Sequence, residues 1–217
     1  MPSNQWNAVV YRAWAPVYDR LLERVFRPGR VAAARALALQ PGERALLIGV
    51  GTGLDLPLLP GGVHAVGIDL SAPMLERARE RAGRVPAHVD LRCGDAATLE
   101  LPTGSFDAAI LNLVLSVVPD PVVVLARTMR ALRPGGRAVV FDKFAPEGRP
   151  PSLARRAANL VTRLFGTEVD RRLGELVSSA GCQVVSDEPS ILRGHYHVVL
   201  LRRADEPPPT ATGPGAG

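Results

Sequence analysis

The chain has 217 residues, 47% of them apolar, and a formal net charge of +5. This length fits one α/β domain, and no apolar run is long enough for a transmembrane helix. The start of the chain lacks the basic-then-apolar pattern of a secretory signal, so we expect a cytoplasmic protein. No nucleic-acid motif accompanies the positive charge, so we expect an anionic membrane surface as partner and no nucleic acid. Cys93 and Cys182 lie outside any metal spacing, and we predict buried thiols in a reducing compartment and no metal site.

Residues 1–40 are predicted to form a lid of amphipathic helices, the first over about 4–26 and the second over about 30–39. Apolar residues in the first segment recur at intervals of three and four, and this face includes Trp6 and Trp14. Tryptophan with interleaved arginine is typical of a helix that lies at a membrane interface. A lid that only packs on the domain is the alternative, and one helix could do both.

A run of apolar residues over 45–48 breaks into the alternating glycines Gly49, Gly51 and Gly53. A near-continuous apolar run is typical of a buried parallel strand, and the glycines allow a tight turn whose backbone can lie against a ligand. Free N–H groups at the start of the next helix favour electron-rich ligand groups. The dinucleotide pattern needs glycine at position 54, which is Leu54, so the spacing argues against a nucleotide-binding oxidoreductase.

Acidic residues follow the next two predicted strands, which cover residues 63–68 and 88–93. Asp69 ends the first of them, where a carboxylate can accept both hydroxyl hydrogens of a ribose. Asp95 follows the second, where it can accept a hydrogen bond from an adenine amino group. Each could be an ordinary loop acid, but together with the glycine turn they indicate a nucleoside site.

The remaining chain continues the alternation of strands and helices. We expect strands at 106–115, 137–142, 182–186 and 194–203, the last antiparallel, and helices at 71–81, 120–132, 152–165 and 168–180. We also expect a turn at 133–136, a helical insertion at about 146–181 and a disordered tail at 204–217. This pattern predicts that residues 41–203 form a doubly wound, Rossmann-like α/β fold.

Several short segments carry a family resemblance: Tyr11, 14–19, 49–54, 67–71, 73–75, 132–136, 141–144, 152–156 and 171–173. On these segments, residues 11–203 resemble a class I S-adenosylmethionine-dependent methyltransferase, most like the soluble bacterial phosphatidylethanolamine N-methyltransferases. The resemblance implies S-adenosyl-L-methionine as cofactor. It also implies a mostly parallel seven-stranded sheet of order 3-2-1-4-5-7-6, with strands numbered along the chain and the seventh reversed.

By the same resemblance, the cofactor contacts the following residues: Tyr18, Gly49, Gly51, Thr52, Gly53, Asp69, Leu70, Met74, Asp95, Ala96 and Asn112. The chain departs from the superfamily at one position, because the residue two before Gly49 is usually acidic and is Leu47 here. The carboxylate that supports the methionine part of the cofactor is therefore missing from this strand. Either the affinity is weaker or another group substitutes, and a different acceptor is also compatible with the departure.

Four residues are predicted to serve the methyl acceptor. Tyr11 and Tyr18 could close the cofactor site from the lid, or they could be aromatic core contacts. His195 and Tyr196 begin the last strand, which starts at the ligand edge of the sheet if it is reversed. Either could take a proton from the acceptor directly or through water. An incidental surface position is the alternative for His195.

Three functions are compatible with these features. We favour N-methylation of phosphatidylethanolamine and its methylated intermediates by a protein peripheral to the inner face of the cell membrane. Methylation of a soluble small molecule or quinone precursor is the second, and an oxidoreductase or a catalytically idle binding module is the third. The membrane hypothesis predicts a docking face around the acceptor entrance that consists of Trp6, Arg12, Trp14, Arg20, Arg24, Arg155, Arg156, Arg163, Arg171 and Arg172.

Overall fold

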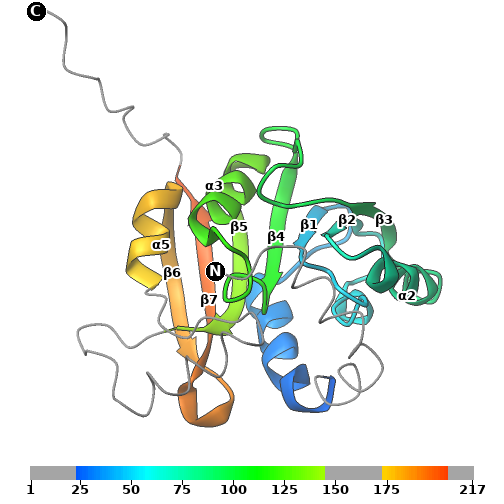
Figure 1. The fold of residues 1–217 in the computed structure, drawn as a ribbon, viewed down its shortest axis with the longest axis horizontal. Coiled ribbons are helices and arrows are strands. Elements are labelled where there is room, and N and C mark those ends of the chain that lie inside the picture. The colour runs from blue at the N-terminus through cyan, green and yellow to red at the C-terminus, as the bar shows by residue number, and fades with distance from the viewer. Residues whose placement is uncertain (1–22, 145–172, 205–217) are drawn as a thin grey trace, which may run out of the picture.

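The computed structural model describes residues 23–144 and 173–204, which are built around one seven-stranded sheet (Figure 1). The strands are β1 Arg44–Ile48, β2 His64–Asp69, β3 His88–Cys93, β4 Phe106–Asn112, β5 Leu132–Lys143, β6 Cys182–Pro189 and β7 Tyr196–Arg203. They lie in the order β3-β2-β1-β4-β5-β7-β6. The first five in this order are parallel, and β7 is antiparallel to both of its neighbours. The predicted fold class and strand order are confirmed.

Helices cover both faces of the sheet. Successive side chains of a strand point to opposite faces, and each face carries an apolar core that the helices bury. They are a helix over residues 23–37, η1 Leu56–Leu58, α2 Ala72–Ala82, α3 Pro121–Ala131, α5 Leu173–Ala180 and η2 Leu192–Gly194. Leu46 and Ile48 belong to the apolar core under α3 and α5. Leu47, between them, belongs to the core under helix 23–37 and α2. The central strand β1 is therefore buried on both faces.

Several element boundaries differ from the prediction. A single helix runs over residues 23–37, where the sequence predicts a break between positions 26 and 30. β5 begins at Leu132, so the turn predicted at 133–136 lies inside this strand, as an irregularity in its pairing with β4. β6 extends to Pro189 because it pairs with β7 along this whole length. The elements predicted at 4–22 and 152–165 and the tail from 205 lie outside the described residues.

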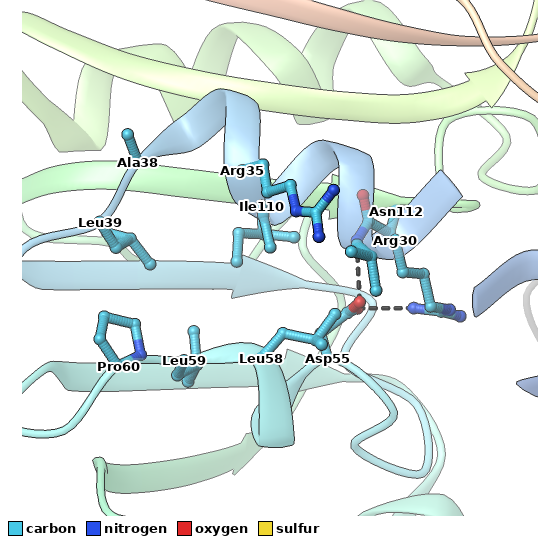
Figure 2. Close-up of a pocket in the computed structure, with 12 residues that line it drawn as sticks. Arg30, Arg35, Ala38, Leu39, Asp55, Leu58, Leu59, Pro60, Ile110 and Asn112 are labelled. Atoms are coloured by element: carbon cyan, nitrogen blue, oxygen red, sulfur yellow. Dashed lines mark hydrogen bonds and ion pairs between the residues drawn. The ribbon is translucent and has the colours of Figure 1, made fainter. Parts of the chain in front are cut away.

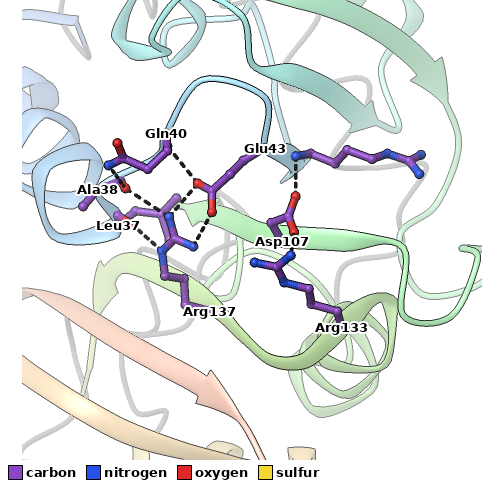
Figure 3. Close-up of polar contacts among 8 residues, drawn as sticks. Leu37, Ala38, Gln40, Glu43, Asp107, Arg133 and Arg137 are labelled. Carbon is purple, nitrogen blue, oxygen red and sulfur yellow. Dashed lines mark hydrogen bonds and ion pairs between the residues drawn. The ribbon is translucent and has the colours of Figure 1, made fainter.

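An arginine fastens the C-terminal end of helix 23–37 to the edge of the sheet where the parallel strands begin (Figure 3). Arg137 of β5 binds both carboxylate oxygens of Glu43, at 2.9 and 2.7 Å. It also donates to the carbonyl oxygens of Leu37 at 2.6 Å and Ala38 at 3.0 Å. These carbonyls lie at the end of the helix, where no intrahelical donor remains for them. The hydrogen bond from Arg137 is the largest cause of the lowered pKa of Glu43.

Replacing Arg137 by glutamine should lower the free energy of unfolding by about 1–2 kcal/mol, because the half-buried Glu43 carboxylate loses both guanidinium hydrogen bonds and the Leu37 carbonyl loses its donor. A carboxylate with a lowered pKa stabilises the fold above its usual pKa, here 4.5, and this contribution is lost as the pH falls. The difference between the wild type and Arg137→Gln, measured by urea unfolding, should therefore shrink below that pH.

Arg133→Gln is the matched control, because Arg133 also pairs with a carboxylate, that of Asp107, but its side chain is 57% exposed. Water and salt screen such a pair, so the control should change stability little. Equal effects of the two substitutions would contradict the role given to Arg137.

Candidate functional site

The glycine turn after β1 leaves its backbone open to a ligand at one position. Gly49, Gly51 and Gly53 have φ angles of +66°, +56° and +82°, in the left-handed region that strains other residues. A Cβ on Gly49 or Gly53 would lie 2.7 or 2.8 Å from a protein side chain, whereas a Cβ on Gly51 would lie 3.9 Å from its nearest neighbours, which include Met74 Sδ. Thr52 is buried within the turn. A ligand can therefore approach the backbone at Gly51.

Asp69, at the end of β2, faces this turn. Its Oδ2 accepts from the N–H of Gly51 at 2.7 Å, and its Oδ1 accepts from the N–H of Ser71 at 2.9 Å. Burial raises the pKa of the Asp69 carboxyl, and these backbone N–H groups partly oppose that rise. Each oxygen has further acceptor capacity, so the ionised carboxylate can also accept both hydroxyl hydrogens of a ribose.

The end of β3 brings the second predicted acid to the same edge. The N–H of Gly94 donates to the carbonyl oxygen of Asp69 at 2.9 Å, which joins the ends of β2 and β3. Asp95 and Ala96 are half-buried at this point. Leu70, whose side chain follows Asp69 and is 41% exposed, offers an apolar surface nearby. An apolar surface with an acid at the same edge suits the ring and the amino group of adenine.

A buried polar cluster lies where β1 and β4 end (Figure 2). Asp55 accepts from Asn112 Nδ2 at 2.8 Å and from Arg30 Nη1 at 2.6 Å. The three residues line an open cavity of about 300 Å³, together with other residues of helix 23–37, η1 and β4. Sequence reasoning selected Asn112 but missed Arg30 and Asp55. The available signal was that Asp55 is the only acid between Gly53 and Asp69, in an otherwise apolar stretch.

The strand order makes this end of β1 and β4 the switch point of the sheet. From β1 the sheet continues through β2 to β3 on one side and through β4 to β5 on the other. Ligands of open α/β sheets bind outside the carboxyl ends of the strands at such a point. Asp69 and Asp95 lie on one side of it and Asn112 on the other. The edge therefore suits an elongated ligand with a nucleoside at one end, which fits the cofactor that the resemblance implies.

The start of β7 reaches the same edge of the sheet. Tyr196 pairs with Lys143, the last residue of β5, and His195 stands just before it in an exposed position. The Tyr196 ring is half-buried against Phe26, with 5.1 Å between ring centroids. The part of His195 and Tyr196 in the chemistry stays a prediction. Of the other predicted acceptor residues, Tyr11 and Tyr18 lie outside the described residues.

The end of β5 is a desolvated environment. Asp142 is fully buried and accepts from the N–H groups of Ser116 at 3.0 Å and of Lys143 at 2.8 Å. Burial raises the pKa of Asp142. Burial also lowers the pKa of Lys143, and the Asp142 charge offsets only part of this effect. The Lys143 ammonium therefore loses its proton more readily than a lysine in water.

The two cysteines differ from each other in exposure. Cys182 is buried, and burial raises the pKa of its thiol to about 11, but Cys93 is exposed. The prediction for Cys93 is wrong because β3 is an edge strand that is largely open to solvent. Within residues 23–144 and 173–204, no three His, Cys, Asp or Glu side chains gather in a metal-binding arrangement. None of the described helices is both long and apolar enough to cross a membrane.

Known proteins share both the sequence pattern and the fold. Residues 46–140 match the family model of a methyltransferase domain. The chain is 35% identical over 197 residues to a phosphatidylethanolamine N-methyltransferase of Cereibacter sphaeroides, covering 89% of this chain and 95% of that protein. It is 36% identical over 178 residues to a demethylmenaquinone methyltransferase of Deinococcus radiodurans, covering 78% and 70%. A solved S-adenosylmethionine-dependent methyltransferase of Thermotoga maritima, a possible histamine N-methyltransferase, superposes with a TM-score of 0.67 at 24% identity, covering 89% and 98%.

Proposed function

Because the chain belongs to the class I S-adenosylmethionine-dependent methyltransferases, we propose that it N-methylates phosphatidylethanolamine and its methylated intermediates at a membrane surface. The observation that carries this acceptor is the match to a phosphatidylethanolamine N-methyltransferase, which spans 89% of this chain and 95% of that relative. The match to a quinone methyltransferase covers a smaller share of both chains.

In methyl transfer from a sulfonium to an amine, the protein contributes mainly by positioning the two reactants and by excluding water. When bound, S-adenosylmethionine supplies an activated methyl group. The acceptor nitrogen has to come within roughly 3–3.5 Å of that carbon. Gly51 and Asp69 lie where they would hold the cofactor, and β5 and β7 bring Lys143 and Tyr196 to the neighbouring part of the same edge.

The acceptor amine has to lose a proton before it can attack. An alkyl ammonium in water has a pKa near about 10, so it is charged at neutral pH. Burial lowers the pKa of the Lys143 ammonium, and the same desolvation would favour the neutral form of an acceptor bound beside it. His195, or Tyr196 in its ionised form, would receive the proton directly or through a water molecule.

The aromatic rings at this edge suit the methylated products. Each methylation leaves an amine that still binds a proton or, after the third transfer, a permanent cation. Phe26 and Tyr196 are half-buried with their ring centroids 5.1 Å apart. A cation over the face of such a ring gains about 0.5–2 kcal/mol. Successive intermediates could thus stay at the site.

The docking face predicted from the sequence remains part of this proposal. Of the residues in this face, Arg24 alone lies within the described ranges, and it is exposed on helix 23–37. We expect the wild type to float with anionic vesicles at low salt and to be released at high salt, since each arginine contributes about 1 kcal/mol that salt screens. Changing Arg155, Arg156, Arg171 and Arg172 to glutamine should abolish this binding and leave cofactor affinity unchanged.

Four other arginines give a control with the same change in charge. Arg84, Arg130, Arg133 and Arg202 are exposed. They lie around the opposite edge, where the parallel strands begin. Their replacement by glutamine should leave most of the flotation intact. If the wild type does not bind anionic vesicles at low salt, or if both quadruple variants lose binding equally, the predicted docking face is contradicted.

The acceptor class is tested by incubating the protein with methyl-labelled S-adenosylmethionine and a total lipid extract. The proposal predicts label in amine headgroups of phospholipids. Label confined to quinones or to water-soluble compounds would favour methylation of a quinone precursor or a soluble small molecule instead.

A further inference from the structure

The first strand leaves the cofactor without the carboxylate that its family places there. Leu47 is 1% exposed and packs in the same apolar core as Ile110 of β4 and Phe141 of β5. Its side chain occupies the sheet face that an acid at this position would occupy. Whatever replaces that carboxylate has to reach this face near the ends of β1 and β4.

Asp55 follows the glycine turn in sequence, and its side chain lies near the ends of β1 and β4. It occupies the N-cap position of η1, yet its side chain caps no backbone N–H. It is 4% exposed and turns instead toward Asn112, at 2.8 Å, and Arg30, at 2.6 Å. The Asp55 side chain therefore does not cap η1. It accepts hydrogen bonds from residues of two other elements, which indicates a role other than capping.

This arrangement fixes which way the amide of Asn112 points. A carboxylate only accepts hydrogen bonds, so the Nδ2 of Asn112 has to face Asp55 and its Oδ1 has to face away. Asn112 is 5% exposed, and its Oδ1 has no hydrogen-bond partner within the described residues. The Nε of Arg30 is likewise buried without a partner there. Buried polar groups without partners are costly, and here one is an acceptor and one a donor.

We propose that Asp55 replaces the missing carboxylate and, with Arg30 and Asn112, receives the amino-acid end of S-adenosylmethionine. The Oδ1 of Asn112 accepts from the ammonium group, the guanidinium of Arg30 faces the carboxylate group, and Asp55 positions both side chains. The charges of Asp55 and Arg30 match a zwitterion, and the cluster lies across the switch point from Asp69 and Asp95, where the nucleoside binds. The inference rests on the cofactor of the family and not on the identity of the acceptor.

Binding of three ligands distinguishes the contributions of the amino-acid end and the adenosine end of the cofactor. S-adenosylmethionine carries both charged groups of the amino acid, its decarboxylated form keeps only the amine, and 5′-methylthioadenosine has neither. Asp55→Asn should weaken the decarboxylated form roughly 10- to 100-fold in calorimetric titration, because Asn112 is no longer held with its Oδ1 toward the amine and the amine meets an unbalanced Arg30. Arg30→Gln should weaken S-adenosylmethionine but not the decarboxylated form. Neither variant should change the affinity for 5′-methylthioadenosine.

The third ligand also reports whether the adenosine site of a variant is intact. If Asp55→Asn does not fold because Arg30 lacks its counter-charge, the double variant Arg30→Gln/Asp55→Asn removes both charges and allows the same comparison. An unchanged affinity of Asp55→Asn for the decarboxylated form would overturn the proposal. So would an equal loss for all three ligands, which would mark Asp55 as purely structural. A failure to methylate phospholipids would leave these affinity ratios unaffected.

Discussion

Replacing Asp69 by alanine should weaken S-adenosylmethionine binding by about 1–3 kcal/mol, or roughly 5- to 150-fold. The ribose hydroxyls would lose a charged acceptor. The glycine turn would lose the carboxylate that accepts from Gly51 at 2.7 Å and from Ser71 at 2.9 Å. Calorimetric titration of the folded variant measures the change. An unchanged dissociation constant would remove Asp69 from the cofactor site.

The pH dependence of binding provides a check on the same carboxylate. Burial raises the pKa of Asp69 above its usual value of 3.8. Hydroxyl donors favour the ionised form, so affinity should fall as the pH drops through this raised pKa. Asp69→Asn keeps the shape but cannot ionise, and its weaker affinity should not show this fall. A wild-type affinity that stays flat down to pH 4 would contradict the assigned role.

Replacing Gly29 by alanine should lower the free energy of unfolding by about 2–3 kcal/mol. Gly29 is buried in helix 23–37, and a Cβ built on it would lie 2.1 Å from Cζ of Phe141. The Phe141 ring is fully buried and cannot move aside without disturbing the core. Alanine gains about 1 kcal/mol of helix propensity over glycine, which is less than the cost of overpacking. Denaturant unfolding measures the balance.

Gly83→Ala is the matched control. Gly83 ends α2 with a φ of −66°, and a Cβ on it would meet only carbonyl oxygens at 3.8 Å. This substitution should be neutral or slightly stabilising. Because the clash at Gly29 is with Phe141, Gly29→Ala combined with Phe141→Leu should be less destabilising than the sum of the single changes. Additive effects would show that the ring contact is not the cause.

The strands could be predicted from sequence because local patterns identify them, whereas their order was implied by the family resemblance and is confirmed by the structure. Apolar runs such as 45–48 and the glycine turn after them identify parallel strands without help from the rest of the molecule. Gly29 shows the opposite case. With Pro28 beside it, Gly29 looks like a helix breaker, but tertiary packing against Phe141, 112 positions further along the chain, is what requires a glycine there. The residues near Gly29 in the sequence give no indication of that contact.

The candidate site divides in the same way. Asp69 and Asp95 follow strands at recognisable spacings, so their position at one edge of the sheet could be predicted, and their contacts with a nucleoside stay a prediction. Asp55 precedes a short helix and resembles an ordinary capping residue, and its contacts with Arg30 and Asn112 join positions 25 and 57 residues apart. Its role therefore emerges only once the sheet has brought β4 beside β1. Likewise, the exposure of Cys93 depends on the edge position of β3 and not on neighbouring residues.

The proposed acceptor of this methyltransferase is the amine of a phospholipid. The most direct measurement is mass spectrometry of vesicles made from phosphatidylethanolamine and an anionic lipid, after incubation with the protein and methyl-labelled S-adenosylmethionine. The proposed function predicts labelled headgroups that carry one or more added methyl groups, with Asp69→Ala much less active than the wild type. Unlabelled phosphatidylethanolamine, with protein that binds the cofactor normally, would contradict it.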